Sequence, residues 1–210
     1  FGKKRNIIMD MDGTLADSMP FWKNSAREYA ILRGADIPDN FDEITGVMDL
    51  NDYAEYVKNV LGIDTNLEQI TEAAVEIMNK HYEKDIPAKD GMTELVTREY
   101  KAGSRLVVFT ASDRRSVEIL LSHLGIRECF YDIYTVYDVG LKKSDKNSYL
   151  KVAELAGMKD TSQVWVYEDI LRGVKAAKEA GLNVCAVYDE DSAGDWEDIK
   201  ELADKTLELV

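Results

Sequence analysis

Cysteine is scarce in this sequence, and long apolar runs are missing. Only Cys129 and Cys185 occur among 210 residues, and they are far apart and without metal-site spacing. This excludes a disulfide-stapled scaffold and a cysteine-based zinc site. No apolar stretch approaches the roughly 20 residues of a transmembrane helix, and no signal peptide is recognisable. We therefore expect a cytoplasmic protein that does not enter the membrane.

Positive charge is also in short supply. The chain has 26 Lys and Arg residues against 40 Asp and Glu residues, which gives a formal net charge of −14 at pH 7. Nucleic acids and anionic membranes are bound through basic patches, so we expect neither as a partner. An anionic substrate requires a pocket in which this charge is locally inverted. Nothing in the sequence indicates the oligomeric state.

The segment from residue 17 to residue 87 has the apolar periodicity of helices. Apolar side chains recur there every three or four residues, as in the stripe from Ile70 to His81. Turn-forming residues divide the segment into about four helices: Gly34, Pro38, Gly46 and Gly62. The pattern predicts a small helical domain at 17–87, inserted into a second domain made of residues 1–16 and 88–210.

After residue 88 the pattern changes to alternating strands and helices. Short β-branched or apolar runs predict strands at residues 105–109, 131–137, 164–167 and 183–187. Amphipathic helical stretches separate them. Such alternation is typical of a parallel sheet with right-handed crossovers, so the sequence predicts an α/β fold.

The opening run Asn6-Ile-Ile-Met-Asp10-Met-Asp12-Gly-Thr is the most informative stretch. It is a short apolar run before a turn signal, which predicts a buried strand. Residues two apart in a strand share a face, so Asp10 and Asp12 emerge together at its carboxyl end. Two like charges about 4 Å apart repel by roughly 4 kcal/mol at an effective dielectric near 20. Either one carboxyl is protonated or a cation lies between them.

A calcium-binding loop is the obvious alternative for this acidic turn, and its spacing does not fit. That loop needs glycine at its sixth position and glutamate at its twelfth. Counted from Asp10, the glycine is fourth and the twelfth residue is Phe21.

Polar residues follow the second, third and fourth predicted strands. Thr110-Ala111-Ser112 follows the second strand, Lys142-Lys143 the third, and Glu168-Asp169 the fourth. Each has an ordinary explanation, because Ser112 suits a helix N-cap and Lys143 a solvated loop. All of them, however, belong to the carboxyl edge of one parallel sheet, where ligands bind in open α/β folds.

These segments, in this order, resemble the four sequence motifs of the haloacid dehalogenase superfamily. The matching residues are Asp10-Met-Asp-Gly-Thr, Thr110, Lys143 and Glu168-Asp169. The resemblance implies a Rossmann-like parallel sheet of order 5-4-1-2-3, flanked by helices and with the first strand central. It also implies that the helical insert at 17–87 is a small helical-bundle cap domain of type 1.

The resemblance implies a phosphoryl-transfer site as well. Asp10 would attack phosphorus and form an aspartyl-phosphate, and Asp12 would act as general acid and then as general base. Thr110 would donate a hydrogen bond to a phosphoryl oxygen. Lys143 would offset negative charge. Lys142 and Lys146 remain alternatives, because Ser144 and Lys146 replace the prolines usual beside this lysine.

The cofactor that the resemblance implies is Mg²⁺, a hard cation that prefers oxygen ligands. Asp10, Asp169 and the backbone carbonyl of Asp12 would hold it, with Glu168 supporting it directly or through water.

Further substrate contacts are expected at the second motif and in the cap. Ala111 and Ser112 adjoin Thr110, and Arg114 follows them, although a solvated arginine in a first helical turn is also expected there. Gly46 and Trp22 would close over the leaving group, with cap–core packing as the alternative for Trp22.

The acid at Asp12 separates the reactions of the superfamily, because members that dehalogenate carbon generally lack it. Hydrolysis of phosphomonoesters and phosphosugar mutation remain. The β-phosphoglucomutase branch has a hinge histidine where this chain has Trp22, and a phosphate-gripping arginine that residues 45–50 lack. We therefore expect a phosphatase acting on a small phosphorylated metabolite, with a mutase as the alternative. A catalytically idle binding module is the third hypothesis, although binding alone would not require Asp12.

Overall fold

The computed structural model describes residues 4–208, which fall into two compact units. One contains the described residues up to Ser18 together with those from Ile86 on, and is called the α/β unit here. The other contains Met19–Asp85 and is called the helical unit.

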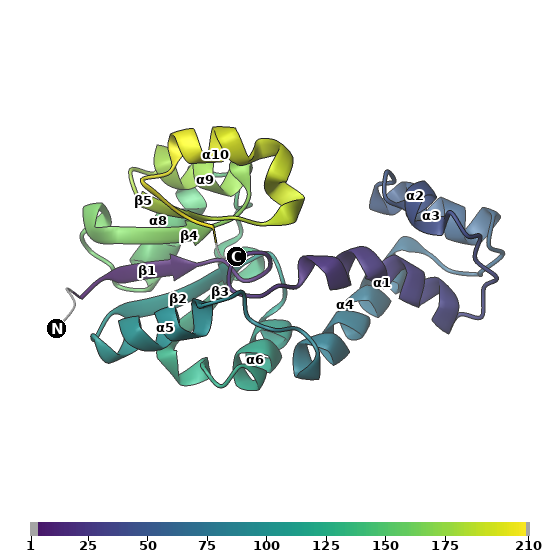
Figure 1. The fold of residues 1–210 in the computed structure, drawn as a ribbon, viewed down its shortest axis with the longest axis horizontal. Coiled ribbons are helices and arrows are strands. Elements are labelled where there is room, and N and C mark those ends of the chain that lie inside the picture. Colours follow the sequence, from purple (N-terminus) through teal and green to yellow (C-terminus); the bar gives the residue numbers. More distant parts are fainter. Residues whose placement is uncertain (1–3, 209–210) are drawn as a thin grey trace. The chain divides into compact units, whose positions relative to one another are not determined.

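The α/β unit is built on a parallel sheet of order β3-β2-β1-β4-β5-β6 in the described part of the chain (Figure 1). The predicted parallel α/β fold and the implied order of the first five strands are confirmed. The strands are β1 (Asn6–Met9), β2 (Arg105–Thr110), β3 (Phe130–Thr135), β4 (Val164–Glu168), β5 (Asn183–Val187) and β6 (Lys205–Leu207). The edge strand β6 was not predicted.

β1 is central because its side chains can be buried on both faces of the sheet. Ile7, Ile8 and Met9 are fully buried, as expected of a parallel strand that reads as a continuous apolar run. In register, Met9 lies opposite Val108 of β2 and Tyr167 of β4. The residues that follow β1, β2 and β4 therefore meet at one edge.

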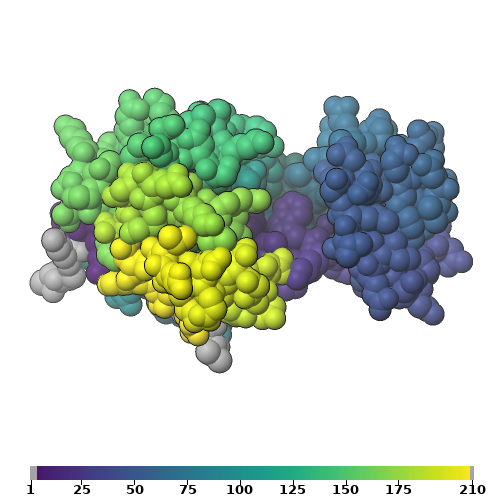
Figure 2. Space-filling model, turned by 90° about the horizontal axis from the view of Figure 1, so that it is seen from above, coloured from purple at the N-terminus to yellow at the C-terminus, as the bar shows by residue number. Residues whose placement is uncertain are grey.

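Helices cover the two faces of this sheet (Figure 1). One core cluster joins Ile8, Phe109 and Val166 to residues of α8, α9 and α10. The helices α5 and α6 contact β2 and β3. The helices of this unit are α5 (Met92–Lys101), α6 (Arg114–His123), α7 (Val136–Val139), α8 (Lys146–Leu155), α9 (Leu171–Glu179) and α10 (Trp196–Leu202). Three 3₁₀ turns lie at Arg127–Cys129, Thr161–Gln163 and Glu190–Asp195. In Figure 2 the yellow C-terminal segment lies at the surface of this unit.

The helical unit consists of four helices around its own core. They are α1 (Met19–Leu32), α2 (Phe41–Thr45), α3 (Leu50–Asn59) and α4 (Leu67–Lys84). Tyr29, Phe41, Tyr53 and Ile70 are among the buried residues of that core. Side-chain caps fix the helix starts: Asp49 accepts from two backbone N–H groups of α3, and Asn66 forms a capping box with Gln69 on α4. Among the described residues, no helix has the length and apolar character to cross a membrane.

The chain leaves and re-enters the α/β unit through two segments that lie side by side. Ala16 forms an antiparallel bridge with Ala88, and the N–H of Asp17 donates to the carbonyl of Pro87 at 3.0 Å. Ser18, at the end of the outgoing segment, is fully buried. Backbone pairing therefore fixes the residues immediately after Asp12.

His81 joins two helices of the helical unit through its two ring nitrogens. Nδ1 lies 2.8 Å from Asp85 Oδ2, and Nε2 lies 2.9 Å from Glu28 Oε1 on α1. The ring of Phe21 packs against the imidazole, with 5.0 Å between centroids. Partial burial lowers the pKa of His81, but the hydrogen bonds and charges of Glu28 and Asp85 outweigh it and raise the pKa above 6.5.

We expect His81→Gln to destabilise the protein more in acid than in alkali. Because the folded-state pKa is raised, the charged form of His81 contributes its full stability below the unfolded pKa of about 6.5 and loses it as pH rises through the folded value. Urea unfolding should therefore show a loss of about 1 kcal/mol near pH 6 and much less near pH 9. The exposed His123, changed to Gln, is the control. An equal cost for His81→Gln at both pH values would contradict the ion-pair assignment.

Candidate active site

Three strand ends bring the predicted site residues together. Asp10 follows β1 directly, Thr110 is the last residue of β2, and Glu168 is the last residue of β4, with Asp169 next. The N–H of Asp10 donates to the carbonyl of Tyr167 at 3.0 Å, which ties the ends of β1 and β4 to each other. The sheet order thus brings three of the four sequence motifs together at one edge.

Asp10, Glu168 and Asp169 form a buried cluster of carboxylates. Each offers an oxygen that lies within 4.8 Å of the other two. Burial raises the pKa of Asp10 to about 7, and the charges of Glu168 and Asp12 add to this while Lys143 opposes it. Burial, followed by the charges of Glu168 and Asp10, also raises the pKa of Asp169 well above its usual value. Such a set of hard oxygen donors fits a divalent cation, which would relieve the repulsion.

Lys143 is the lysine beside Asp10. Its ammonium group bonds both Asp10 and Glu168, and its side chain is buried. Lys142 and Lys146 are exposed. Burial lowers the pKa of Lys143, but the charges of Asp10 and Glu168 raise it well above 10.5, so the residue is a fixed cation.

Glu168 is held by donors on both of its oxygens. Oε1 meets the ammonium of Lys143 and accepts from the hydroxyl of Tyr149 at 3.2 Å. Oε2 accepts from the backbone N–H groups of Asp169 and Ile170 at 2.8 and 3.0 Å. A carboxylate has about four acceptor sites, so these contacts use nearly all of the capacity of Glu168.

The turn after β1 holds Asp169 in place. The hydroxyl of Thr14 donates to Asp169 Oδ1 at 2.8 Å. Gly13 has φ +84°, and a Cβ there would lie 2.4 Å from Asp169 Oδ2. The glycine is therefore required twice, for the left-handed turn and for the close approach of Asp169. The sequence reasoning did not find the role of Thr14.

Two serines hold Asp12. Ser18 Oγ donates to Asp12 Oδ1 at 2.6 Å, and Ser112 Oγ donates to Asp12 Oδ2 at 2.7 Å. Ser112 is not the N-cap of α6, since Asp113 caps that helix. The N–H of Ser112 donates to Thr110 Oγ1 at 3.0 Å, and Ala111 is exposed in the same turn. Ser112 therefore supports Asp12 and Thr110, and the role of Ser18 was missed.

Arg114 does not join this cluster. Its guanidinium donates to the carboxylates of Asp132 and Asp138 and to the carbonyl of Ile133. These partners lie on β3 and α7, so the guanidinium is paired with residues of the α/β unit, and a substrate contact of Arg114 stays a prediction. The first turn of α6 directs the long side chain to the neighbouring strand.

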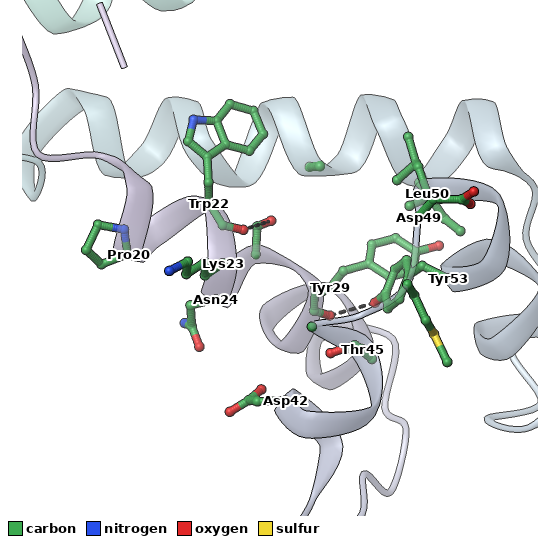
Figure 3. Close-up of a pocket in the computed structure, with 16 residues that line it drawn as sticks. Pro20, Trp22, Lys23, Asn24, Tyr29, Asp42, Thr45, Asp49, Leu50 and Tyr53 are labelled. Carbon is green, nitrogen blue, oxygen red and sulfur yellow. Dashed lines mark hydrogen bonds between the residues drawn. The ribbon is translucent and has the colours of Figure 1, made fainter. Parts of the chain in front are cut away.

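Trp22 and Gly46 line one pocket within the helical unit (Figure 3). The pocket has a volume of about 560 Å³, and tyrosine rings from α1 and α3 also contribute to its wall. The indole N–H of Trp22 donates to the hydroxyl of Tyr82 at 3.0 Å. A Cβ at Gly46 would lie 2.7 Å from the carbonyl of Asp42, so the loop excludes larger residues there.

A parallel α/β sheet with clustered acids and a lysine at its carboxyl edge, interrupted after its first strand by a helical unit, defines a haloacid dehalogenase-type hydrolase. The chain belongs to the haloacid dehalogenase-like hydrolase family, whose sequence model matches residues 7–187.

Among its relatives is fructose-1-phosphate phosphatase YqaB of Escherichia coli, which is 27% identical over 189 residues, covering 86% of this chain and 95% of that protein. Protein SUPPRESSOR OF QUENCHING 1, chloroplastic, of Arabidopsis thaliana is 29% identical over 195 residues, but the match spans only 18% of that protein's length. A solved structure from Thermotoga maritima, provisionally assigned as a β-phosphoglucomutase, has a TM-score of 0.80 at 22% identity. It covers 97% of this chain and 94% of that one, and the likeness shows the fold.

Proposed function

We propose that the protein is a Mg²⁺-dependent phosphomonoester hydrolase that acts on a small phosphorylated carbohydrate through an aspartyl-phosphate on Asp10. The observation that carries this proposal is the joint burial of Asp10 with Asp169, Glu168 and Lys143. Asp12, held by its two serines, lies two residues further along the same turn. The reaction needs both a nucleophile and a separate acid, and the chain offers both.

The proposed chemistry has two steps. A carboxylate oxygen of Asp10 attacks phosphorus, and the bond from phosphorus to the ester oxygen breaks as Asp12 gives that oxygen its proton. Asp12 then takes a proton from a water molecule that attacks the aspartyl-phosphate, which releases inorganic phosphate and restores Asp10. Thr110 donates to a phosphoryl oxygen. Lys143 offsets the negative charge of the site in both steps.

The donor set fits Mg²⁺. Asp10, Asp169 and the backbone carbonyl of Asp12 would hold the ion, which would withdraw charge from the phosphoryl oxygens. Glu168 would support it through water, because four protein donors already occupy its oxygens.

The substrate class rests on the relatives. YqaB is named for the hydrolysis of fructose 1-phosphate, and a Thermotoga maritima relative, 26% identical, is named as a phosphatase of phosphorylated carbohydrates. A mutase must hold a second phosphate while its intermediate turns over. Residues 45–50 contain no arginine for this purpose, which favours a hydrolase.

We expect the purified protein to hydrolyse p-nitrophenyl phosphate with Mg²⁺ and to lose that activity with EDTA. Mg²⁺ should also stabilise the folded state, by about 2.7 kcal/mol at a hundredfold excess over its Kd. Phosphate release from a panel of hexose and polyol phosphates would then identify the substrate. Conversion of a sugar phosphate into its isomer without phosphate release would favour the mutase, and Mg²⁺ binding without any turnover would favour a binding module.

A further inference from the structure

Tyr149, on α8, contacts the carboxylate cluster through Glu168. It is 1% exposed, and its hydroxyl donates to Glu168 Oε1, the oxygen that also meets Lys143. Its ring packs edge-on against Phe109 of β2, with centroids 5.2 Å apart and an interplanar angle of 87°. The packing fixes the ring, and the ring fixes the direction of the hydroxyl.

Gly173 on α9 leaves the space for this contact. A Cβ at Gly173 would lie 2.4 Å from Glu168 Oε1 and 3.0 Å from the hydroxyl oxygen of Tyr149. Glu168 is fully buried and held on both oxygens, so it cannot move aside easily. The glycine inside a helix, where alanine is intrinsically better, is explained by the glutamate–tyrosine pair that it accommodates.

We propose that Tyr149 is a positioning residue that completes the donors around Glu168 and thereby holds Lys143 against Asp10. Three of the donors to Glu168 are the backbone N–H groups of the next two residues and the ammonium of Lys143. The same ammonium also bonds Asp10. Tyr149 supplies the remaining donor, on the oxygen that Lys143 uses. Without the hydroxyl of Tyr149, Lys143 is the one donor left to Glu168 Oε1 among those described above. The ammonium is then drawn toward Glu168 and away from Asp10. This inference rests on the proposed function, because it concerns the same nucleophile and metal site.

The test compares Tyr149→Phe with Tyr167→Phe. Both variants delete one phenolic hydroxyl from a buried tyrosine, but Tyr167 precedes Glu168 on β4 and points to the opposite face of the sheet. Mutation of a group that orients a metal ligand typically lowers metal affinity or activity 10- to 100-fold. We expect Tyr149→Phe to weaken Mg²⁺ binding in calorimetric titration about tenfold and to lower kcat about tenfold, with KM for p-nitrophenyl phosphate within about twofold of wild type. Tyr167→Phe should leave all three values unchanged.

Gly173→Ala approaches the same contact from the other side. Its added methyl group displaces Glu168, so it should also lower kcat and Mg²⁺ affinity. Because both substitutions act through one carboxylate, the double variant Tyr149→Phe/Gly173→Ala should lose less than the product of the two single effects. Strictly multiplicative losses would overturn the idea that Tyr149 acts through Glu168.

The outcomes separate this inference from the proposed function. If the wild-type protein shows no Mg²⁺-dependent turnover, the proposed function is refuted. The effect of Tyr149 on Mg²⁺ binding can still be measured in that case, because calorimetric titration does not need turnover. Weaker Mg²⁺ binding in Tyr149→Phe alone supports the positioning role. Equal Mg²⁺ affinity in both variants, or a change in melting temperature without a change in kcat or Mg²⁺ affinity, overturns it and leaves Tyr149 a packing residue.

Discussion

Replacing Asp10 by asparagine should lower phosphatase activity by at least about 10⁴-fold, because the amide cannot form the aspartyl-phosphate. Asparagine has nearly the same shape as aspartate, and Lys143 retains Glu168 as a partner. The fold should therefore survive, as urea unfolding would verify. The measurement is kcat for p-nitrophenyl phosphate with Mg²⁺ in excess.

The control for Asp10→Asn is the same substitution at Asp64, an exposed residue of the helical unit. Asp64→Asn changes the net charge equally but touches none of the clustered acids, so its kcat should match wild type. If Asp10→Asn kept substantial turnover, another group would have to be the nucleophile, and the mechanism proposed here would be wrong.

Much of the fold follows from local sequence pattern. β1, β2, β4 and β5 are short apolar runs, and buried parallel strands have that signature because both of their faces are covered. β6 has no such signature: Lys205-Thr-Leu207 is three residues long and partly exposed. It is a strand because β5 offers it a free edge, with Lys205 opposite Cys185. Pairing at an edge is a tertiary event, and the local sequence does not encode it.

Some residues of the site could also be predicted from the sequence and others could not. The acids and Thr110 could be found because they follow strands, and the strand ends of a parallel sheet converge. Lys143 follows α7 and was found from its place in the order of the motifs. Thr14, Ser18 and Tyr149 could not, because their importance lies in which atom each one touches. Thr14 meets a carboxylate 155 residues away in sequence. Such contacts depend on side-chain rotamers and helix rotation, which spacing does not specify.

Arg114 is a residue whose side-chain partners the sequence did not indicate. Its position just after the second motif suggested a cation near the substrate. Its partners, Asp132 and Asp138, belong to a strand with weak sequence signal and to a four-residue helix. These acids accept from the guanidinium in the structure, and the sequence spacing gave no sign of them.

Replacing Asp12 by asparagine should give the second-largest loss, and it should depend on the leaving group. General acid catalysis is worth about 10²- to 10⁴-fold. A sugar alkoxide needs that proton, so its release should slow by such a factor. p-Nitrophenolate needs little protonation, so Asp10 should still be phosphorylated by the aryl ester. Asparagine also cannot accept from both Ser18 and Ser112 as aspartate does, because one of its two terminal atoms is a donor.

The second step distinguishes Asp12 from Asp10. Asp12→Asn lacks the base that activates water, so p-nitrophenyl phosphate should produce a burst of one p-nitrophenolate per protein molecule followed by slow turnover. Rapid acid quenching and mass spectrometry should then find one phosphoryl group on the peptide that contains Asp10. Asp10→Asn should show neither burst nor label. If Asp12→Asn turned over the aryl ester at the wild-type rate, Asp12 would have no part in hydrolysing the intermediate, and the base would have to be sought among the buried acids Glu168 and Asp169.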